Sequence, residues 1–508
     1  MFSTPRFHNT LTHRVEPFTS LEPGVVRMYN CGPTVYDYAH IGNFRAFLFA
    51  DLLRRYLELI GLRVIQVMNL TDVGHMTDDD AADGGGEDKM QKAQRRLLEA
   101  KKSGRLPAGV QLDPSDPRAV ADFYIHAFLA DARALGLRVA AEHHADPALT
   151  FMPRATDHVT TGMIPMIARL IERGHAYVAS DRAVYFDVQS FPAYGRLSGN
   201  TLDHLRAGAG GRVSDAHQAV KRHPADFLLW KPDAAHLMKW DSPWGPGYPG
   251  WHIECSAMAR ARLGREEIDL HTGGEDNIFP HHECEIAQSC GCWGRDRFAT
   301  FWLHTRFLLV DGEKMSKSKG NFHTVRDLLA RGAQPAAIRL ELLRSHYRSN
   351  ANFSLQGLED AYRRIERLRR LRDRLGPPGD ADVARSHPAV LRFTEALADD
   401  LNIAAALAEL ESWSAHATPG PSDAAALAAM DSVLGLLDLP AQPQAGQAGG
   451  DAKPTDGEDG VAARCAAIDA ARARKDFAAA DALRRELQEL GYEVKTDKSG
   501  TTARRRVV

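Results

Sequence analysis

The chain has 508 residues, too many for one compact core, and this length predicts two to four domains. Apolar residues make up 44% and charged residues 25%, as in ordinary globular proteins, and six cysteines in a chain of this length exclude a disulfide scaffold. The formal net charge of −3 argues against a wholly cationic nucleic-acid binder, so any contact with RNA must use local basic faces.

The first predicted elements form the start of a parallel α/β sheet. Residues 25–29 are a short β-prone run that ends in the turn Asn30-Cys31-Gly32-Pro33. From about Asn43, apolar residues recur at a near-helical period until Gly61, and residues 63–68 are predicted to form the next strand. The order strand, turn, helix, strand predicts a parallel sheet, which binds ligands at the carboxyl ends of its strands.

Beyond this first unit the composition changes several times. Residues 77–117 are polar and predict a surface excursion with one helix near 89–100. Residues from about 153 to 302 mix short strands with Gly and Pro turns and carry most of the unusual residues. After about residue 321 the chain is predicted to be helical, and it is rich in arginine.

The C-terminal part is set apart by its composition. Residues 440–460 have almost no large apolar side chains, which predicts a flexible linker. Residues 461–490 follow as two short predicted helices, the second of which ends at Gly491.

Two motifs have the composition of nucleotide-handling segments. The first, His40-Ile41-Gly42-Asn43, lies at the entrance to the first predicted helix, where backbone N–H groups attract phosphate and an imidazole can donate a hydrogen bond. The second, Lys314-Met315-Ser316-Lys317-Ser318, is a lysine-rich loop of the kind that stabilises charge in nucleotidyl transfer. Each motif alone is also compatible with a structural helix start or a solvated basic loop.

The two motifs together, in this order and on either side of a large insertion, resemble the HIGH and KMSKS signatures of class I aminoacyl-tRNA synthetases. The resemblance implies an α/β fold: a Rossmann-like parallel-sheet catalytic domain with an inserted subdomain, followed by a helical anticodon-binding domain. Asn43 departs from the usual histidine of the first signature. Because Asn also donates a hydrogen bond, function is expected to survive this change.

Four residues from three separate segments are candidate metal ligands. Cys31 lies on the first predicted turn, and Cys255 and the pair His281 and Glu285 lie further along the chain. Pro280 favours a helix start, which would place His281 and Glu285 on one helix face. Two thiolates, one imidazole and one carboxylate are a plausible zinc set. Spacing alone leaves small buried cysteines and a polar helix start as the alternative, and it does not bring Cys31 to Cys255.

Longer segments narrow the resemblance to cysteinyl-tRNA synthetases, from about residue 25 to residue 404 and more faintly at the C-terminus. The segments that carry it are CGPTVYD (31–37), NLTDV (69–73), PRAT (153–156), DFLLWK (226–231), GWHIECSAM (250–258) and FPHHE (279–283). The resemblance implies a set of zinc ligands, which are Cys31, Cys255, His281 and Glu285. It also implies pocket residues, which include Thr71, Trp251 and His271.

The resemblance further implies how the chain divides. The catalytic domain would cover residues 1–330, with nucleotide-binding halves at about 20–150 and 250–330 and an insertion at about 151–249. The other divisions would be a helical connecting region that contacts the tRNA stem at 331–380, a helical anticodon-binding domain at 381–439, the linker at 440–460 and a small C-terminal helical or mixed domain at 461–508.

The implied reaction has two steps. Cysteine attacks the α-phosphorus of ATP and expels pyrophosphate, and a ribose hydroxyl of the terminal adenosine of tRNA then attacks the cysteinyl-adenylate. The resemblance assigns His40, Asn43, Lys314 and Lys317 to catalysis. It places Gly42 and Lys317 at the ATP, which Mg²⁺ would accompany. One zinc ion per chain would select cysteine against serine, because zinc binds a soft thiolate strongly and lowers the pKa of the thiol.

The implied partners are tRNA(Cys), ATP and L-cysteine, and the chain is expected to be a monomer without a membrane partner. No run of about 18 apolar residues occurs, and residues 1–9 lack the apolar core of a signal peptide. These features predict a cytoplasmic location. Seven arginines between residues 363 and 374 lie on one predicted helix, for which RNA phosphate contact is the favoured interpretation and a solvated face the alternative.

Two other functions fit parts of the sequence. A ligase paralogue that joins cysteine to an amino sugar shares the nucleotide motifs and the zinc site, but it typically lacks a long C-terminal RNA-binding region. A non-catalytic regulator that binds zinc and nucleotide is the second alternative, and the presence of His40, Lys314 and Lys317 argues against it.

Overall fold

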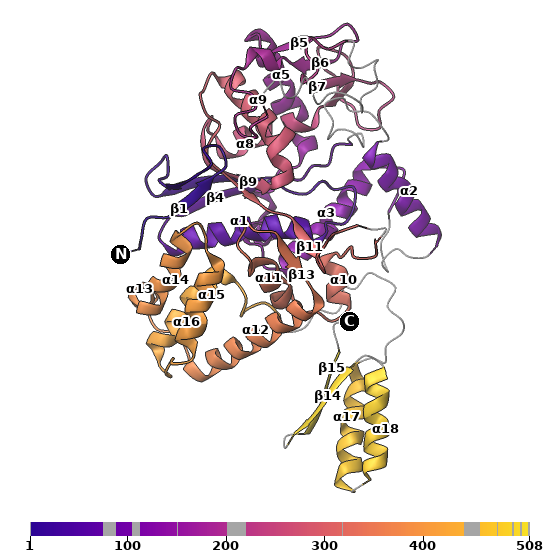
Figure 1. The fold of residues 1–508 in the computed structure, drawn as a ribbon. Helices are drawn as coiled ribbons and strands as arrows, with labels where there is room; N and C mark the ends of the chain where they lie inside the picture. Colours follow the sequence, from indigo (N-terminus) through magenta and orange to yellow (C-terminus); the bar gives the residue numbers. More distant parts are fainter. Residues whose placement is uncertain are drawn as a thin grey trace.

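A four-stranded parallel sheet lies across the middle of the molecule, in the strand order β10-β9-β3-β4 (Figure 1). Its strands are β3 (Val25–Asn30), β4 (Arg63–Met68), β9 (Ile268–Gly274) and β10 (Ala299–Thr305). The structure is a computed structural model that describes residues 2–74, 88–103, 112–149, 151–200, 220–316, 319–440, 458–474, 476–489, 492–497 and 500–505.

The sheet is wound outwards in two directions from its middle. Strand β3 leads through helix α1 (Ile41–Leu59) to β4, and β9 leads through α9 (Glu283–Trp293) to β10 on the other side. Because β3 and β9 are neighbours, the direction of winding switches between their carboxyl ends. Such a switch point is where open α/β sheets bind ligands. The predicted strand, helix and strand at the start of the chain are confirmed, as is the parallel α/β class.

Helix α1 runs along this sheet and is capped at both ends. Its apolar side chains recur three or four residues apart and are buried. His40 caps its first turn, and the chain leaves the helix at Gly61, whose φ of 98° lies in the left-handed region that favours glycine.

The insertion folds as a separate layer at the top of Figure 1. Its antiparallel sheet has the order β5-β6-β7-β8, with strands at Ala176–Val178, Val184–Phe186, Phe227–Pro232 and Gly247–Pro249. This sheet, helix α5 (Ile164–Glu172), α8 (Trp251–Leu263) and α9 share one hydrophobic core, which includes the fully buried Trp230 and Trp302. The insertion therefore packs directly on the two helices that carry two of the four predicted metal ligands, Cys255 and Glu285.

The chain after the lysine motif is helical, as predicted, and lies below the sheet in Figure 1. It contains α10 (Val325–Ala330), α11 (Pro335–Leu343), α12 (Leu355–Leu375), α13 (Ala381–Ser386), α14 (Pro388–Ala398), α15 (Ile403–Ser414) and α16 (Pro421–Leu434). The lysine motif begins in a small sheet of order β12-β11-β13, with strands at Glu313–Lys314, Leu308–Val310 and Ala351–Phe353.

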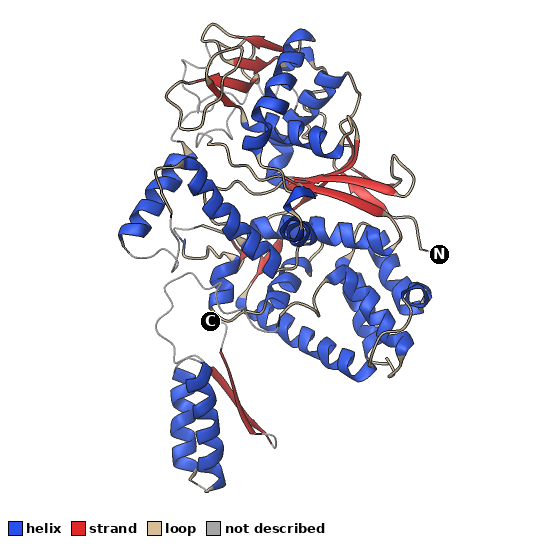
Figure 2. Ribbon diagram, turned by 180° about the vertical axis from the view of Figure 1, so that it is seen from behind, coloured by secondary structure: helices blue, strands red, loops and turns tan. Residues whose placement is uncertain are grey.

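The remaining elements surround these layers (Figure 2). They are the antiparallel pair β1 (Arg6–Asn9) and β2 (Arg14–Pro17) and the helices α2 (Lys89–Lys102), α3 (Pro117–Ala134) and α4 (Arg138–Ala145). Short 3-10 or π turns lie at Pro147–Leu149, Ala155–His158, Val159–Met163, Val188–Ser190, Glu275–Asn277 and Ile278–His282. The helix predicted near residues 89–100 is confirmed as α2, and the rest of the polar stretch at 77–117 lies largely outside the described residues.

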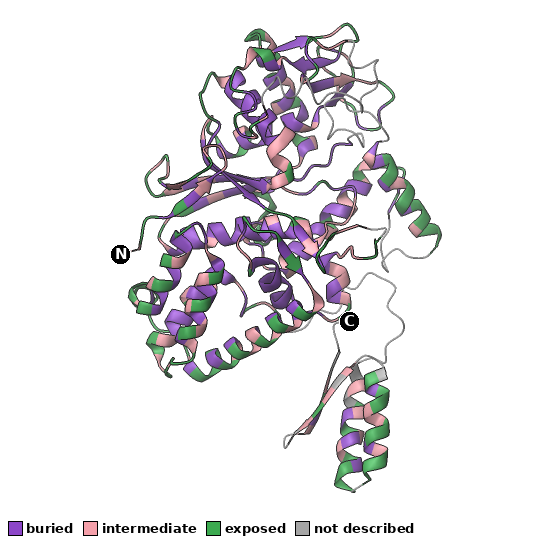
Figure 3. Ribbon diagram, viewed as in Figure 1, coloured by how far each residue is buried: buried purple, intermediate pink, exposed green. Residues whose placement is uncertain are grey.

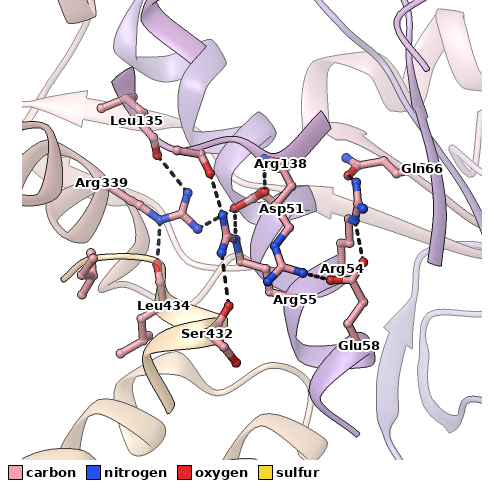
Figure 4. A network of polar contacts seen from close by, with 12 residues as sticks. Asp51, Arg54, Arg55, Glu58, Gln66, Leu135, Arg138, Arg339, Ser432 and Leu434 are labelled. Atoms are coloured by element: carbon pink, nitrogen blue, oxygen red, sulfur yellow. Dashed lines mark hydrogen bonds and ion pairs between the residues drawn. The ribbon is translucent and has the colours of Figure 1, made fainter. Parts of the chain in front are cut away.

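A buried arginine joins α1 to the helices α10 to α16, here called the helical part (Figure 4). Arg339 of α11 donates hydrogen bonds to the carbonyl oxygen of Leu434 at 2.6 Å, that of Leu135 at 3.0 Å and Asp51 Oδ2 at 2.5 Å. Arg55 Nε also donates to Asp51 Oδ2, at 2.6 Å. Burial alone would raise the pKa of Asp51, but Arg339 and Arg55 lower it to about 2. One ionic centre thus connects α1, the end of α3, α11 and the end of α16.

The C-terminal unit consists of α17 (Glu458–Ala473), α18 (Phe477–Glu489) and the hairpin of β14 (Tyr492–Asp497) and β15 (Gly500–Arg505). The two predicted helices are confirmed, but the helical structure begins at Glu458, inside the stretch predicted as a linker, and the hairpin was not predicted. Figure 3 shows exposed faces along α12, α17 and α18, while the central sheet and α1 are mostly buried. Within the described residues, no helix combines the length and apolar character needed to cross a membrane.

Candidate active site

The four predicted metal ligands meet at the switch point of the sheet. Cys31 directly follows β3, Cys255 lies on α8, His281 lies in the turn before α9 and Glu285 lies in its first turn. One ligand atom from each of these four residues, here called the metal cluster, lies within 4.8 Å of the ligand atoms of the others. The sheet order brings Cys31 and Cys255 together, which the spacing of the sequence could not do. That the cluster binds zinc stays a prediction.

The turn before α9 differs from the prediction in detail. The α-helix begins at Glu283, and His281 belongs to a π turn in which Phe279 has non-helical angles. His281 and Glu285 nevertheless lie on one face, with Nε2 of the imidazole 3.1 Å from Oε1 of the carboxylate. Cys31 Sγ lies 3.8 Å from the same oxygen. One oxygen of Glu285 therefore lies close to two other members of the metal cluster.

Two further histidines, His252 and His271, contact ligand residues of the metal cluster. His252 Nδ1 lies 2.9 Å from His281 Nδ1, on the ring side opposite the nitrogen that faces Glu285. His271, predicted as a pocket residue, is fully buried, and its Nε2 lies 3.1 Å from Glu285 Oε2. Partners of this kind orient the ligands of a metal ion. His252 was not singled out in the sequence, although it stands in the same segment as Cys255.

The electrostatics of the metal cluster favour a cation. Burial alone would lower the pKa of His281, but Cys255 and Glu285 raise it to about 10. Burial would raise the pKa of Glu285, but His271 and His281 lower it to about 2. Of the two thiols, burial and Cys255 raise the pKa of Cys31, whereas the hydrogen bond from Cys31 lowers that of Cys255 against the effect of burial. The carboxylate of Glu285 thus carries negative charge inside the cluster, next to the ring of His281 that it helps to keep protonated.

A second set of potential ligands overlaps the first and consists of Cys31, His271, His282 and Glu285. His282 Nε2 lies 3.2 Å from Cys31 Sγ, and its Nδ1 lies 2.7 Å from His304 Nε2. Burial and the neighbouring histidines lower the pKa of His282, which keeps its ring neutral. Of the pair His281-His282, His281 was the predicted ligand. Two thiols suit zinc better than one, so the first set fits zinc better.

The predicted pocket residues Trp251 and Thr71 lie beside the metal cluster. The Trp251 ring has its centroid 4.5 Å from that of His281. Thr71 lies beyond the carboxyl end of β4, and its backbone pairs with the chain just after Cys31 through Thr71 N to Pro33 O at 3.0 Å. Its hydroxyl donates to Glu254 at 3.1 Å. Their contacts with a substrate stay predictions.

The first nucleotide motif forms the N-terminal cap of α1. His40 Nδ1 accepts a hydrogen bond from Asn43 N at 3.2 Å, and Asn43 Oδ1 accepts one from His40 N at 3.1 Å. Asn43 therefore has a structural role as well as the predicted catalytic one. Because Nδ1 of His40 accepts, the proton of the neutral ring lies on Nε2, which can donate to a phosphate.

The second motif reaches the first through its flanks. Ile41 N donates to the carbonyl oxygen of His323 at 3.0 Å, and a Cβ atom added to Gly42 would lie 2.8 Å from Cε of Met315. The same Cβ atom would lie 2.9 Å from two ring atoms of His40, so glycine at position 42 lets both side chains approach the helix entrance. Lys314 is exposed, with Nζ 5.6 Å from the ring centroid of Phe307. Lys317 lies outside the described residues. The described parts of the two motifs therefore lie next to each other.

The comparisons with known proteins agree with this arrangement. The family model described as "tRNA synthetases class I (C) catalytic domain" matches residues 17–363. Two relatives, each described as "Cysteine--tRNA ligase", from Salinibacter ruber and Gluconobacter oxydans, are 44% and 42% identical to this chain. The alignments cover 99% and 98% of this chain and 98% of each relative. The chain belongs to the cysteine–tRNA ligase family.

A solved structure of another class I enzyme shares the fold of this cysteine–tRNA ligase family member. The LeuRS of Agrobacterium radiobacter, in a ternary LeuRS–tRNA–LeuAMS complex, superposes with a TM-score of 0.54 at 12% identity. The match covers 87% of this chain and 88% of that chain. At this identity the likeness shows the fold alone.

The arginines of α12 were predicted to contact RNA phosphates. Several of them have partners within the protein. Arg364 Nε lies 2.6 Å from Glu411 of α15, Arg369 donates to the carbonyl oxygen of Leu439 at 2.7 Å and Arg372 donates to that of Leu437 at 3.2 Å. A groove of about 360 Å³ between α11 and α12 is lined by Leu340, Arg344, Gly357, Asp360, Ala361, Arg363, Arg364 and Arg367. Part of the arginine set therefore holds the helical part together, and part faces solvent.

Proposed function

We propose that this chain is a cysteine–tRNA ligase that activates L-cysteine with ATP and transfers it to the 3′-terminal adenosine of tRNA(Cys). The observation that carries the proposal is the metal cluster of two thiols, one imidazole and one carboxylate at the switch point of the sheet, beside the paired nucleotide motifs. The relatives that share 42–44% of the sequence, each described as "Cysteine--tRNA ligase", support the choice of substrate.

The donor set fits one zinc ion per chain, since it combines two sulfur ligands with one nitrogen and one oxygen ligand. A bound zinc ion would attract a thiolate and lower the pKa of the thiol, which selects cysteine against serine. The protein contributes the orientation of the ligands. His252 contacts the ring of His281 and His271 contacts the carboxylate of Glu285, so both ligands are held from behind.

In the activation step, the carboxylate of cysteine attacks the α-phosphorus of ATP and pyrophosphate leaves. Because Nδ1 of His40 accepts from Asn43 N, the neutral imidazole carries its proton on Nε2, the atom that would donate to a phosphate oxygen. Lys314 and Lys317 add positive charge where the leaving pyrophosphate carries negative charge, and Mg²⁺ accompanies the ATP. Because Gly42 has no Cβ atom, Met315 can approach the entrance of the helix closely.

In the transfer step, a ribose hydroxyl of the tRNA attacks the activated carboxyl carbon and AMP leaves. The exposed arginines beside the groove between α11 and α12 supply charge for RNA phosphates. In this proposal residues 1–330 carry activation, residues 331–380 contact the tRNA stem and residues 381–439 bind the anticodon end, with a linker and a small domain after them. The enzyme works as a cytoplasmic monomer.

Two assays with the full chain test the proposal. We expect exchange of pyrophosphate into ATP that depends on cysteine and is far slower with serine. A non-catalytic regulator would show no exchange. We then expect cysteine to be attached to tRNA(Cys), whereas a paralogue that uses an amino sugar as acceptor would leave the tRNA uncharged. Exchange without charging would therefore overturn the tRNA half of the proposal.

A further inference from the structure

A buried chain of hydrogen bonds connects the residues next to the two thiols of the metal cluster. Gly32 N donates to Asn69 Oδ1 at 2.8 Å, Asn69 Nδ2 donates to Thr71 Oγ1 at 3.0 Å and Thr71 Oγ1 donates to Glu254 Oε2 at 3.1 Å. The exposed fractions of Asn69, Thr71 and Glu254 are 2%, 1% and 0%. Gly32 directly follows Cys31, and Glu254 directly precedes Cys255.

The direction of each hydrogen bond in this series is determined by which of its two groups can donate. A backbone N–H can only donate, so the amide oxygen of Asn69 must face Gly32 and its NH₂ group must face Thr71. The Thr71 oxygen accepts from that NH₂ group, and its one hydrogen is directed to the carboxylate of Glu254. Thr71 is therefore acceptor on one side and donor on the other, and only a side chain that does both can replace it.

The backbone strengthens the same connection. Thr71 N donates to the carbonyl oxygen of Pro33 at 3.0 Å, and Val35 N donates to the carbonyl oxygen of Thr71 at 3.0 Å. Thr71 is thus fixed to the loop that carries Cys31, and its hydroxyl is the described link from that loop to the first turn of α8, where Cys255 lies. A shift of either segment would stretch these bonds, because the side chains of Asn69, Thr71 and Glu254 are buried and the bonds have normal hydrogen-bond lengths.

We propose that Asn69, Thr71 and Glu254 form a brace that sets the separation of the two thiol ligands and so tunes the metal affinity of the cluster. The inference rests on the proposed function in taking the cluster as a zinc site. None of the three side chains need touch the metal, so they act as positioning residues. Groups that hold metal ligands in place typically contribute about 10- to 100-fold to metal affinity.

Thr71→Val tests the brace, because valine has nearly the shape of threonine but can neither donate nor accept. Zinc affinity, measured in the full chain by competition with a chromophoric chelator, should fall roughly 10- to 100-fold. Thr71→Ser keeps the hydroxyl and should stay within about threefold of the natural protein. Thr394→Val is the matched control, since Thr394 is also a buried threonine, on α14, and should leave the affinity unchanged.

Glu254 provides an independent pair of variants if Thr71→Val folds poorly. Glu254→Gln keeps an oxygen that can accept from Thr71 and should weaken zinc binding less than Glu254→Leu, which removes the acceptor. Cobalt in place of zinc supplies a second readout, because its visible spectrum reports the geometry around two sulfur ligands and should change in Thr71→Val but not in Thr71→Ser.

The brace is refuted if Thr71→Val binds zinc within about threefold of the natural protein, or if Thr71→Ser loses as much affinity as Thr71→Val. These measurements need neither ATP nor tRNA. A natural protein that binds zinc but shows no cysteine-dependent pyrophosphate exchange would overturn the proposed function and leave the brace standing, so the two failures are distinguishable.

Discussion

The buried arginine of α11 offers the sharpest test of how the helical part is attached to the catalytic sheet. Arg339→Met keeps an unbranched side chain of similar length and removes every donor. The side chain is fully buried, so water cannot easily replace the lost bonds. The carbonyl oxygens of Leu434 and Leu135 lose their bonds from the guanidinium, and Asp51 loses one of its charged partners.

The size of the effect follows from these contacts. Two buried carbonyl oxygens without their donors cost about 1 kcal/mol each, and a charge-assisted bond to a carboxylate is worth about 2 kcal/mol. The sum of about 4 kcal/mol agrees with the range of about 3–5 kcal/mol for breaking a buried ion pair on one side. Asp51 keeps Arg55 at 2.6 Å and the backbone N–H of Arg138 at 2.8 Å, so the loss should not exceed this range.

Chemical unfolding followed by circular dichroism measures the effect, with pyrophosphate exchange as a second signal from the same samples. We expect Arg339→Met to lower the free energy of unfolding by about 4 kcal/mol. Arg363→Met on α12 is the control, because that side chain is 60% exposed and its loss should change the free energy by less than about 0.5 kcal/mol. A loss below about 1 kcal/mol in Arg339→Met would show that Arg339 does not hold the two parts together.

Four further predictions concern the site and the tail. Cys255→Ala should lose metal and weaken cysteine binding more than ATP binding, as equilibrium dialysis would show; full zinc occupancy with unchanged cysteine affinity would contradict the ligand assignment. Lys317→Ala should slow adenylate formation by roughly 30- to 1000-fold in pre-steady-state assays, because a charge-assisted contact in the transition state is worth about 2–4 kcal/mol; a change below about threefold would remove this role. Because the folded pKa of Asp51 is about 2 and the unfolded value is about 4, its stabilisation is fully present above about pH 4 and is lost as the pH falls to about 2. Between about pH 4 and pH 2, the free energy of unfolding of Asp51→Asn should therefore fall by about 2 kcal/mol less than that of the natural protein. An unchanged acid-unfolding profile would contradict the low pKa of Asp51. Truncation after Pro440 should leave pyrophosphate exchange nearly intact and weaken tRNA charging, with a smaller salt dependence of tRNA binding because fewer phosphates are neutralised; normal charging would show that the tail does not bind RNA.

The parts of the fold that local sequence determines were predictable. Strands β3 and β4 and helix α1 follow from runs of apolar residues with the right period and from Gly61 at the helix end. The hairpin of β14 and β15 was missed because Tyr492, Val494 and Thr496 alternate with charged residues over only six positions, and the second strand is built of small polar and basic residues. The start of α9 was placed too early, since Pro280 lies within the π turn Ile278–His282 and the α-helix itself begins at Glu283.

The site was predictable as a set of residue types but not as an arrangement. Cys31 and Cys255 are separated by more than half of the catalytic part of the chain, and only the pairing of β3 with β9 brings their segments together. Family resemblance implied in advance that the two cysteines share a site, whereas periodicity could not. The supporting residues His252, Asn69 and Glu254 were overlooked because a buried polar side chain has no sequence signal apart from the motif that contains it.

Helix α1 explains why the nucleotide motif and the helical part belong to one mechanical unit. Its first turn is capped by His40 and Asn43, and its third turn carries Asp51, eleven residues further on. At 1.5 Å per residue these points are about 16 Å apart along one continuous helix, which bends little over such a length. Asp51 is joined through Arg339 to the end of α16 (Figure 4), so a displacement of the helical part acts directly on the helix that presents His40. The C-terminal unit is attached beyond α16 (Figure 1), and none of its described residues bonds to Asp51 or Arg339. Loss of the C-terminal unit should therefore spare activation, whereas loss of the contact between Arg339 and Asp51 should impair activation and tRNA charging together.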